Sequence, residues 1–220
     1  PSPWRSWPRS PQRGLRNTSC RLISRMRVLV GLDAVRRPPR RAAVTVGVFD
    51  GVHLAHQRLI RTAVVHARRL RGTSLVVTFD PDPQAVLDPA HAQPALMPLD
   101  ARLDRFRALG VDVAWVIPFT RRFAQTTAEQ FIRDVLLRRL RTAALIVGET
   151  FVFGRYRQGN LALLRRLGAS HGMRLVAVRP IRRHGAPVSS SRIRRLIEQG
   201  RLAQAARLLG RPPALFGSVV

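Results

Sequence analysis

The sequence predicts an α/β protein in which helices cover both faces of a parallel sheet. Short apolar runs rich in β-branched residues alternate along the chain with longer segments whose apolar residues recur at helical spacing. This alternation is typical of a parallel sheet, because each connection between parallel strands must cross one face of the sheet. The chain of 220 residues is long enough to bury a core as one domain.

Five apolar runs are the predicted strands, at residues 42–49, 74–79, 111–117, 143–148 and 173–178. The first predicted helix ends before Gly72, and its apolar positions are Leu59, Ile60, Ala63, Val64, Ala67 and Leu70. Further helices are expected at residues 99–109, 127–140, 161–170, 191–199 and 202–209. Thr127 and Gln130 have the spacing of a capping box at the start of one of them.

The segment GVFDGVHLAHQ (residues 47–57) joins the first predicted strand to the first predicted helix. The first N–H groups of a helix lack internal partners and the helix dipole adds positive potential, so phosphate oxygens are stabilised there. His53 and His56 add donors that can become cationic near a phosphate, while Gly47 and Gly51 leave room for close backbone approach. The segment therefore predicts a phosphate site. An H-x-x-H pair is also common among surface or capping residues, and alone it is a weak sign of zinc binding.

Three other segments combine polar and glycine or proline residues: TFDPDP (residues 78–83), FVFGRYRQG (151–159) and VSSSRIR (188–194). Each follows a predicted strand or lies in the loop that leaves it. In an open α/β sheet the ligand site lies outside the carboxyl ends of the strands. We therefore expect all four segments to converge on one crevice.

With these four motifs in this order, the chain from about residue 26 onward resembles the FMN adenylyltransferase (FAD synthetase) module of the bacterial bifunctional riboflavin kinase/FAD synthetase family. The family patterns are G-x-F-D-G-x-H-x-G-H, T-F-D-P-H-P, F-x-F-G-x-x-R-x-G and S-S-[ST]-x-x-R. The resemblance implies a Rossmann-like, HxGH-type nucleotidyltransferase fold. It also implies in-line transfer of AMP from ATP to FMN, giving FAD and pyrophosphate, with Mg²⁺ bridging the ATP phosphates.

The resemblance also assigns roles to single residues. It implies that His53, His56 and Arg194 are catalytic residues at the reacting phosphates. The implied ATP-binding residues are Gly47, Phe49, Asp50, Gly51, Phe153, Gly154, Arg157, Ser190 and Ser191. The implied flavin-side residues are Asp80, Pro81 and Pro83, and the implied metal contact is Thr150. Structural alternatives remain open, because a serine run before a helix is a good N-cap in any protein and Phe151 is equally well placed as a core anchor.

Three residues depart from the family patterns. Ala55 stands where the family has glycine, and its methyl group would crowd a phosphate that contacts the backbone closely. Asp82 replaces a histidine, which exchanges a donor for an acceptor whose charge repels phosphate. Thr150 stands where the family has asparagine or aspartate, so a metal ligand becomes a hydroxyl. Together these changes leave slow or lost catalysis as an open alternative.

The resemblance divides the chain into an FMN adenylyltransferase domain at residues 26–209 and two flanking segments. Residues 1–25 contain six arginines, four prolines and no acid, so we expect a disordered extension or a misassigned start, with a transit peptide as the less favoured interpretation. Residues 210–220 look like the linker and first strand of a riboflavin kinase barrel, cut off at its start. Riboflavin phosphorylation is therefore not expected, and a separate riboflavin kinase is a candidate source of FMN. Natural loss, a split gene and truncation all stay open.

The net charge of +27 would ordinarily indicate nucleic-acid binding. However, all 39 basic residues are arginine, a bias that a GC-rich coding sequence explains, and aromatic residues make up only 6% of the chain. We expect only a weak, salt-sensitive attraction to nucleic acids and other polyanions. The single cysteine, Cys20, excludes a disulfide scaffold, and no apolar run is long enough for a membrane span or a secretory signal. A cytoplasmic enzyme is the expectation.

Two other function classes remain. One is a nucleotidyltransferase that acts on a different phosphorylated acceptor, such as nicotinate mononucleotide or phosphopantetheine. The other is a non-catalytic relic that binds nucleotides or polyanions through its arginines.

Overall fold

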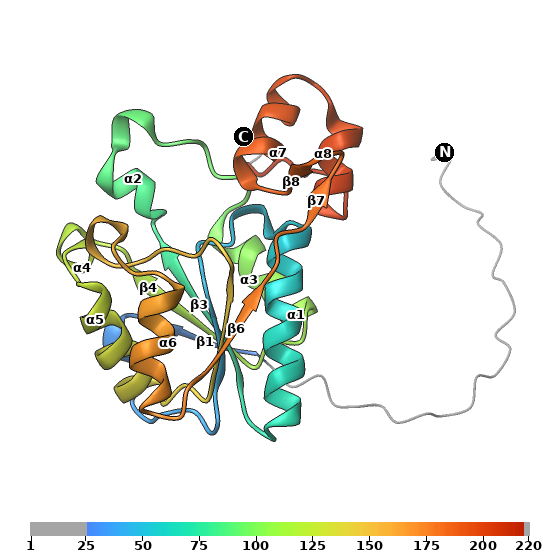
Figure 1. Ribbon diagram of the computed structural model, residues 1–220. Coiled ribbons are helices and arrows are strands. Elements are labelled where there is room, and N and C mark those ends of the chain that lie inside the picture. The colour runs from blue at the N-terminus through green and yellow to red at the C-terminus, as the bar shows by residue number, and fades with distance from the viewer. Residues whose placement is uncertain (1–25, 218–220) are drawn as a thin grey trace, which may run out of the picture.

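The computed structural model describes residues 26–217, so the predicted extension at residues 1–25 and the last three residues lie outside it. A six-stranded sheet with the order β1-β4-β3-β2-β5-β6 forms its centre, and every neighbouring pair of strands is parallel (Figure 1). The strands are β1 (Arg27–Val30), β2 (Ala43–Val46), β3 (Ser74–Asp80), β4 (Val113–Pro118), β5 (Ala144–Gly148) and β6 (Arg174–Val178). A short antiparallel hairpin, β7 (Arg182–Arg183) and β8 (Ala186–Pro187), follows the sheet. The predicted α/β class is confirmed.

Helices cover both faces of the sheet. One face carries α1 (Leu54–Arg69) and α3 (Leu99–Ala108); the other carries α5 (Ala128–Gln130), the π-helix η4 (Phe131–Arg139) and α6 (Leu161–Ala169). The remaining α-helices are α2 (Pro83–Leu87), α4 (Arg121–Ala124), α7 (Ser190–Glu198) and α8 (Leu202–Leu209). Short 3-10 turns are η1 (Leu32–Ala34), η2 (Asp50–Val52), η3 (Pro89–His91) and η5 (Arg155–Arg157).

Side chains of the central strands alternate between two apolar layers, as a pleated strand requires. Along β3, Leu75 and Val77 enter the cluster beneath η4 and α6, while Val76 enters the cluster beneath α1 and α3. Both layers are closed to solvent, which explains why the inner strands are continuous apolar runs rather than alternating ones.

The structure differs from the expected elements in several places. The strand expected at residues 42–49 ends at Val46, because Phe49 adopts a left-handed backbone with φ 56° and the 3-10 turn η2 follows. The helix expected at residues 127–140 begins with the predicted Thr127–Gln130 capping box but continues as a π-helix. Strand β1 was not expected. Residues 211–217, expected as a linker and barrel strand, contain no strand in the described part of the chain.

In Figure 1, α2 and the α7–α8 pair rise on opposite sides of the edge at which the parallel strands end. The loop after β2 reaches α1 at the same edge, and the loop after β3 reaches α2 there. In parallel α/β sheets this edge is the usual place for a ligand site.

Candidate functional site

The histidine turn (residues 47–57) reverses the chain between β2 and α1. Gly51 has φ 76°, and an added Cβ there would lie 2.7 Å from Cδ1 of Leu96, so both the backbone and the space favour glycine. His53 has an extended backbone and caps α1, because its Nδ1 accepts a long hydrogen bond of 3.4 Å from the N–H of His56. The structure therefore confirms that the two histidines lie at the strand-to-helix junction.

The rings of His53 and His56 stack, with centroids 3.6 Å apart and planes inclined by 19°. The ring of Phe49 meets His56 edge-on at 5.2 Å and meets Phe106 in the same way at 5.7 Å, so Phe49 supports the pair from the core. The His56 ring forms no hydrogen bond within residues 26–217, and its Nδ1 is buried without a partner. An unpartnered buried polar atom is unusual in a folded protein.

Burial lowers the pKa of both histidines. The pKa of His53 falls to about 4, mainly because the ring is only 4% exposed; its own backbone raises the pKa, and Arg211 lowers it further. The pKa of His56 falls well below its usual value through burial, then through the neighbouring His53 and Arg102. Both rings are therefore neutral at pH 7 without a bound anion, and the cationic form expected near a phosphate stays a prediction. A neutral imidazole still has one N–H to donate.

Arg194 and Asp50 form a buried ion pair beside the histidine turn. The Arg194 Nη2 lies 2.6 Å from Asp50 Oδ2, and the two side chains are only 12% and 7% exposed. Arg194 Nε donates to the Pro94 carbonyl at 2.6 Å, and the Asp50 carboxylate accepts from the N–H of Leu96 at 2.9 and 3.1 Å. Ser190 Oγ donates to the Asp50 carbonyl at 2.9 Å. Three expected site residues are thus brought together.

The three serines at the start of α7 have different environments. Ser189 is the N-cap and accepts from the N–H of Arg192 at 3.3 Å, which confirms the structural alternative for this residue. Ser190 is tied to the histidine turn, whereas Ser191 is exposed.

Arg102 is a buried residue that the four motifs do not contain. Its Nη1 donates to the carbonyls of Val48 at 2.7 Å and Phe79 at 3.1 Å, and its Nη2 lies 3.5 Å from Asp80 Oδ1. Arg102 therefore joins the ends of β2 and β3, from which the first two motifs extend. The sequence does hint at this burial, because Arg102 is next to Leu103 on the apolar stripe of the predicted helix at residues 99–109.

The segment TFDPDP leads from β3 into α2. Asp80 pairs with Arg102, and Asp82 caps α2 by accepting from the N–H of Gln84 at 2.8 Å. Pro83 is the first residue of that helix, where its missing N–H costs no hydrogen bond. The departure at Asp82 therefore has a local structural reason, because aspartate is a strong N-cap residue.

The segment FVFGRYRQG is held against the core. The rings of Phe151 and Phe153 stack at 5.3 Å, and Phe153 also contacts Phe131 at 5.6 Å. Gly154 has φ 74°, and an added Cβ would lie 2.7 Å from the backbone of Ala128. Phe151 is thus the core anchor that the sequence left open, and Phe153 shares that role. Arg157 and Thr150 are exposed.

Aromatic rings that no motif singled out line the end of β3. Half-buried Phe79, Phe119 and Phe123 contact one another with centroids 5.7 to 6.0 Å apart. They lie beside the segment expected to contact the flavin, so they form an apolar wall that sequence reasoning missed.

Ala55 and the C-terminal helices meet at the histidine turn. The Ala55 methyl group packs against the apolar cluster of α7 and α8, a contact that glycine would lack. Gln57 Nε2 donates to the carbonyls of Val52 at 3.0 Å and Leu209 at 2.9 Å, and Arg211 Nη2 donates to the Gly51 carbonyl at 2.7 Å. The turn is therefore tied to the end of α8.

Two features are absent from residues 26–217. No group of three or more histidine, cysteine, aspartate or glutamate side chains is placed to hold a metal ion there. Among those residues no helix has the length and apolar character needed to cross a membrane.

The chain is similar to several known proteins. Residues 35–192 match the family model described as FAD synthetase. The chain is 33% identical over 196 residues to the bifunctional riboflavin kinase/FMN adenylyltransferase of Escherichia coli, covering 89% of this chain and 63% of the relative. It is 39% identical over 171 residues to a putative bifunctional riboflavin kinase/FMN adenylyltransferase of Geobacillus thermodenitrificans, covering 78% of this chain and 90% of that relative. The chain thus spans under two thirds of the Escherichia coli relative.

Solved structures show the same fold. A structure from Streptococcus pneumoniae titled as a macrolide-efflux protein has a TM-score of 0.70 and 28% identity, over 78% of this chain and 56% of that one. Pantothenate synthetase from Thermus thermophilus has a TM-score of 0.55 at 18% identity, over 84% of this chain and 81% of that one, which indicates the fold alone. Because the family model covers most of the chain, from before β2 to the start of α7, this protein belongs to the FAD synthetase family.

Proposed function

We propose that this protein transfers AMP from ATP to FMN, giving FAD and pyrophosphate. The observation that carries the proposal is the stacked pair His53 and His56 at the start of α1, inside the segment that matches the FAD synthetase model. The His56 ring has no protein hydrogen bond within the described residues, so neither ring nitrogen is committed to a protein partner there.

The reaction needs positioning rather than a protein nucleophile. A phosphate oxygen of FMN attacks the α-phosphorus of ATP, a new P–O bond forms, and the bond to the β-phosphate oxygen breaks as pyrophosphate leaves. The neutral His53 and His56 rings donate N–H groups to the α-phosphoryl oxygens, and the first N–H groups of α1 add to the same positive potential. The rings are neutral before ATP binds, so binding does not have to remove hydration water from a charged imidazolium.

Arg194 is able to contact a phosphate without leaving Asp50. The guanidinium uses Nη2 for Asp50 and Nε for Pro94, which leaves Nη1 without a protein partner in the described residues. We propose that Asp50 is a positioning residue that orients this remaining donor. Ser190 then fixes the backbone on which Asp50 lies.

We propose that Mg²⁺ binds together with ATP. Thr150 fits one ligand position, because its side chain is exposed at the end of β5 and its hydroxyl has no protein partner in residues 26–217. Mg²⁺ prefers oxygen donors and usually takes one or two from protein and the rest from phosphates and water. The ion would neutralise charge on the phosphates.

The proposed flavin site is formed by the apolar wall of Phe79, Phe119 and Phe123. Asp80, Pro81 and Pro83 lie in the adjoining loop. Stacked or edge-on aromatic contacts suit a planar ring system. Because the proposed reaction uses ATP and FMN, we place the protein in the cytoplasm, with a riboflavin kinase as the source of FMN.

The test is turnover of the full chain with ATP, Mg²⁺ and one acceptor at a time, followed by chromatography for the adenylylated product and a pyrophosphate assay. FMN should give FAD, whereas riboflavin should not react, because it lacks the attacking phosphate. His53→Ala and His56→Ala should each lower kcat/KM by at least about a hundredfold, while His66→Ala on the same helix should not. Product from nicotinate mononucleotide or phosphopantetheine without FAD would replace FMN as the acceptor. Pyrophosphate from none of the acceptors would reject the proposal.

A further inference from the structure

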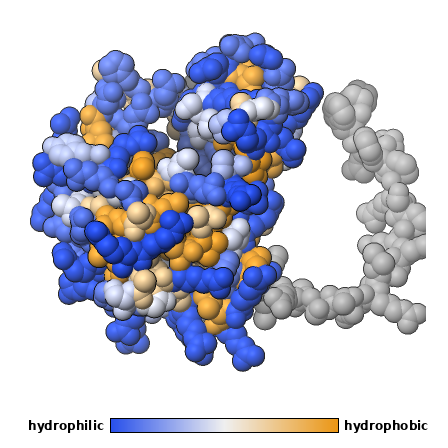
Figure 2. Space-filling view, in the orientation of Figure 1, coloured by the Kyte–Doolittle hydropathy of each residue, from blue (hydrophilic) through white to orange (hydrophobic). Residues whose placement is uncertain are grey.

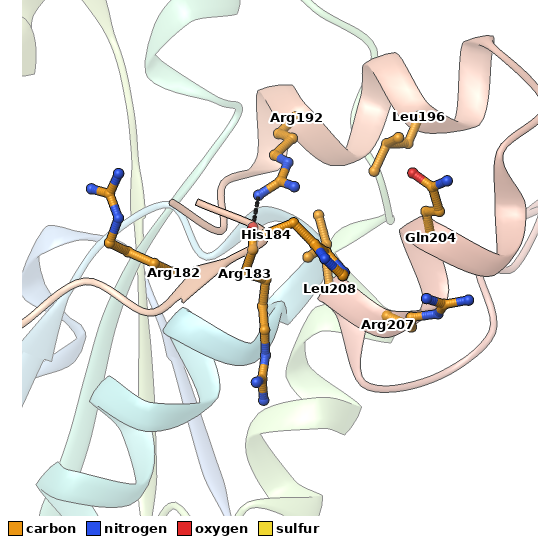
Figure 3. A pocket seen from close by; sticks show the side chains of 8 residues that line it. All are labelled: Arg182, Arg183, His184, Arg192, Leu196, Gln204, Arg207 and Leu208. Atoms are coloured by element: carbon orange, nitrogen blue, oxygen red, sulfur yellow. Dashed lines mark hydrogen bonds between the residues drawn. The ribbon is translucent and has the colours of Figure 1, made fainter. Parts of the chain in front are cut away.

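A basic cavity lies between the β7–β8 hairpin and the α7–α8 helix pair. Its volume is about 590 Å³. Its lining contains the arginines Arg182, Arg183, Arg192 and Arg207 and the imidazole of His184 (Figure 3). Small-molecule sites commonly have volumes of roughly 300–1,000 Å³, so this cavity has the size of a ligand site.

The cavity continues along α7 and α8, on a part of the molecule whose surface is mainly hydrophilic (Figure 2). A second hollow of about 560 Å³ shares His184, Arg192 and Arg207 with the first and adds Arg195 and Arg201. None of the residues expected to bind ATP or flavin lines either hollow. On α7, Arg194 is directed to Asp50, while Arg192 bonds the hairpin on the other side. This basic cavity is therefore separate from the histidine turn.

The arginines of the basic cavity and of the adjoining second hollow fall into two groups. Arg192 Nη1 donates to the carbonyls of Arg183 at 2.9 Å and Ala186 at 3.0 Å, and Arg182 donates to the Gly185 carbonyl, so both hold the hairpin in place. The other group is Arg183, Arg195, Arg201 and Arg207. In the part of the chain that the structure describes, none of these four forms an ion pair with a carboxylate.

Unpaired like charges around one cavity repel each other, and a bound anion removes that repulsion. Guanidinium groups pair with phosphate through two parallel N–H···O bonds, and several forks around one hollow match several phosphoryl groups. The lining contains no phenylalanine, tyrosine or tryptophan on which nucleic-acid bases would stack. A compact anion thus fits better than a polynucleotide.

We propose that the basic cavity, together with the adjoining second hollow, is a second anion site of this protein, which binds a compact oligophosphate, either free or as the phosphate tail of a nucleotide. The backbone bonds of Arg182 and Arg192 shape the site, and Arg183, Arg195, Arg201 and Arg207 supply the charge. Leu196 and Leu208 form its apolar part.

Calorimetric titration of the full chain with sodium tripolyphosphate, and separately with ATP, tests the proposal. The variant R195Q/R207Q removes two free cations. The control R61Q/R165Q removes the same charge from exposed arginines on α1 and α6 that also lack ion pairs in the described structure. We expect R195Q/R207Q to bind one tripolyphosphate fewer than wild type, or to bind it at least about tenfold more weakly, and the control to match wild type. His56→Ala should retain this site.

Binding of tripolyphosphate without ATP would assign the site to free oligophosphate, and binding of both would assign it to the phosphate tail that they share. Equal losses of tripolyphosphate binding in R195Q/R207Q and R61Q/R165Q would show that only the general positive charge attracts the anion, and they would overturn the proposal. Affinity only for a single-stranded oligonucleotide would also overturn it. In urea, the ligand-free R195Q/R207Q protein should be at least as stable as wild type, because it loses repulsion. A clear loss of stability would show that these arginines are structural and not free for a ligand.

Discussion

Replacing Arg194 by glutamine is expected to destabilise the fold as well as to slow the proposed reaction. The Asp50 carboxylate is 7% exposed and lies 2.6 Å from the guanidinium, so Arg194→Gln leaves a buried charge without its cation. Such a loss costs about 3–5 kcal/mol. The two contacts from the Leu96 N–H, at 2.9 and 3.1 Å, remain, which favours the lower end, about 3 kcal/mol. For a chain of this size the Tm should fall by roughly 6–12 °C.

Urea unfolding followed by circular dichroism measures this loss in Arg194→Gln, Asp50→Asn and the double variant. Because both single variants break the same pair, the double variant should lose less than their sum, with a coupling of about 2–3 kcal/mol. The matched control is Arg195→Gln, the exposed next residue, which should change the free energy of unfolding by under about 0.5 kcal/mol. A loss below about 1 kcal/mol in Arg194→Gln, or additive losses, would refute the reasoning.

Acid should destabilise the protein through His53, because its pKa falls from 6.5 to about 4 on folding and the unfolded chain therefore takes up a proton first. Between pH 7 and 4 this residue should lower the free energy of unfolding by about 3 kcal/mol. Urea unfolding at several pH values should show a weaker pH dependence of that free energy in His53→Gln, and an unchanged pH dependence would contradict this. Arg102→Met removes the donor to the Phe79 carbonyl and should lower the free energy of unfolding by about 2–4 kcal/mol. The control Arg105→Met, at an exposed position of the same helix, should lower it by under about 1 kcal/mol. Similar losses in the two variants would disprove a role for the buried bonds. Asp82→Ala should speed hydrogen exchange in α2 by roughly fivefold while Asp82→Ser restores protection, and equal rates would show that the cap contributes nothing.

The inner strands β2 to β5 were predictable because burial on both faces makes each of them an unbroken apolar run. Strand β1 was not, since Arg27 and Val30 of this edge strand are exposed and it carries no clear pattern. The two-residue strands of the β7–β8 hairpin are too short for any periodicity to show. The π-helix at Phe131–Arg139 also escaped, because it buries the same apolar side chains as an α-helix would.

The candidate site, too, is only partly predictable from the sequence. The position of His53 and His56 at a strand-to-helix junction follows from local sequence, and the structure confirms it. The partner of Arg194 does not, because Asp50 lies 144 residues away in the chain and only the packed structure brings them together. Burial explains the neutral histidines, and no sequence pattern measures burial of a single ring.

The histidine turn is held by residues that are synthesised long after it. Its bonds to Ser190, Arg194, Leu209 and Arg211 span 140 to 160 residues of sequence. By contrast, the last strand of the sheet ends at Val178, before any of these residues has been added. During translation we expect the sheet to assemble while the edge that carries the proposed site is still loose, since contacts that close long loops form late. We therefore expect the two histidines to be among the last parts of the domain to reach their final geometry.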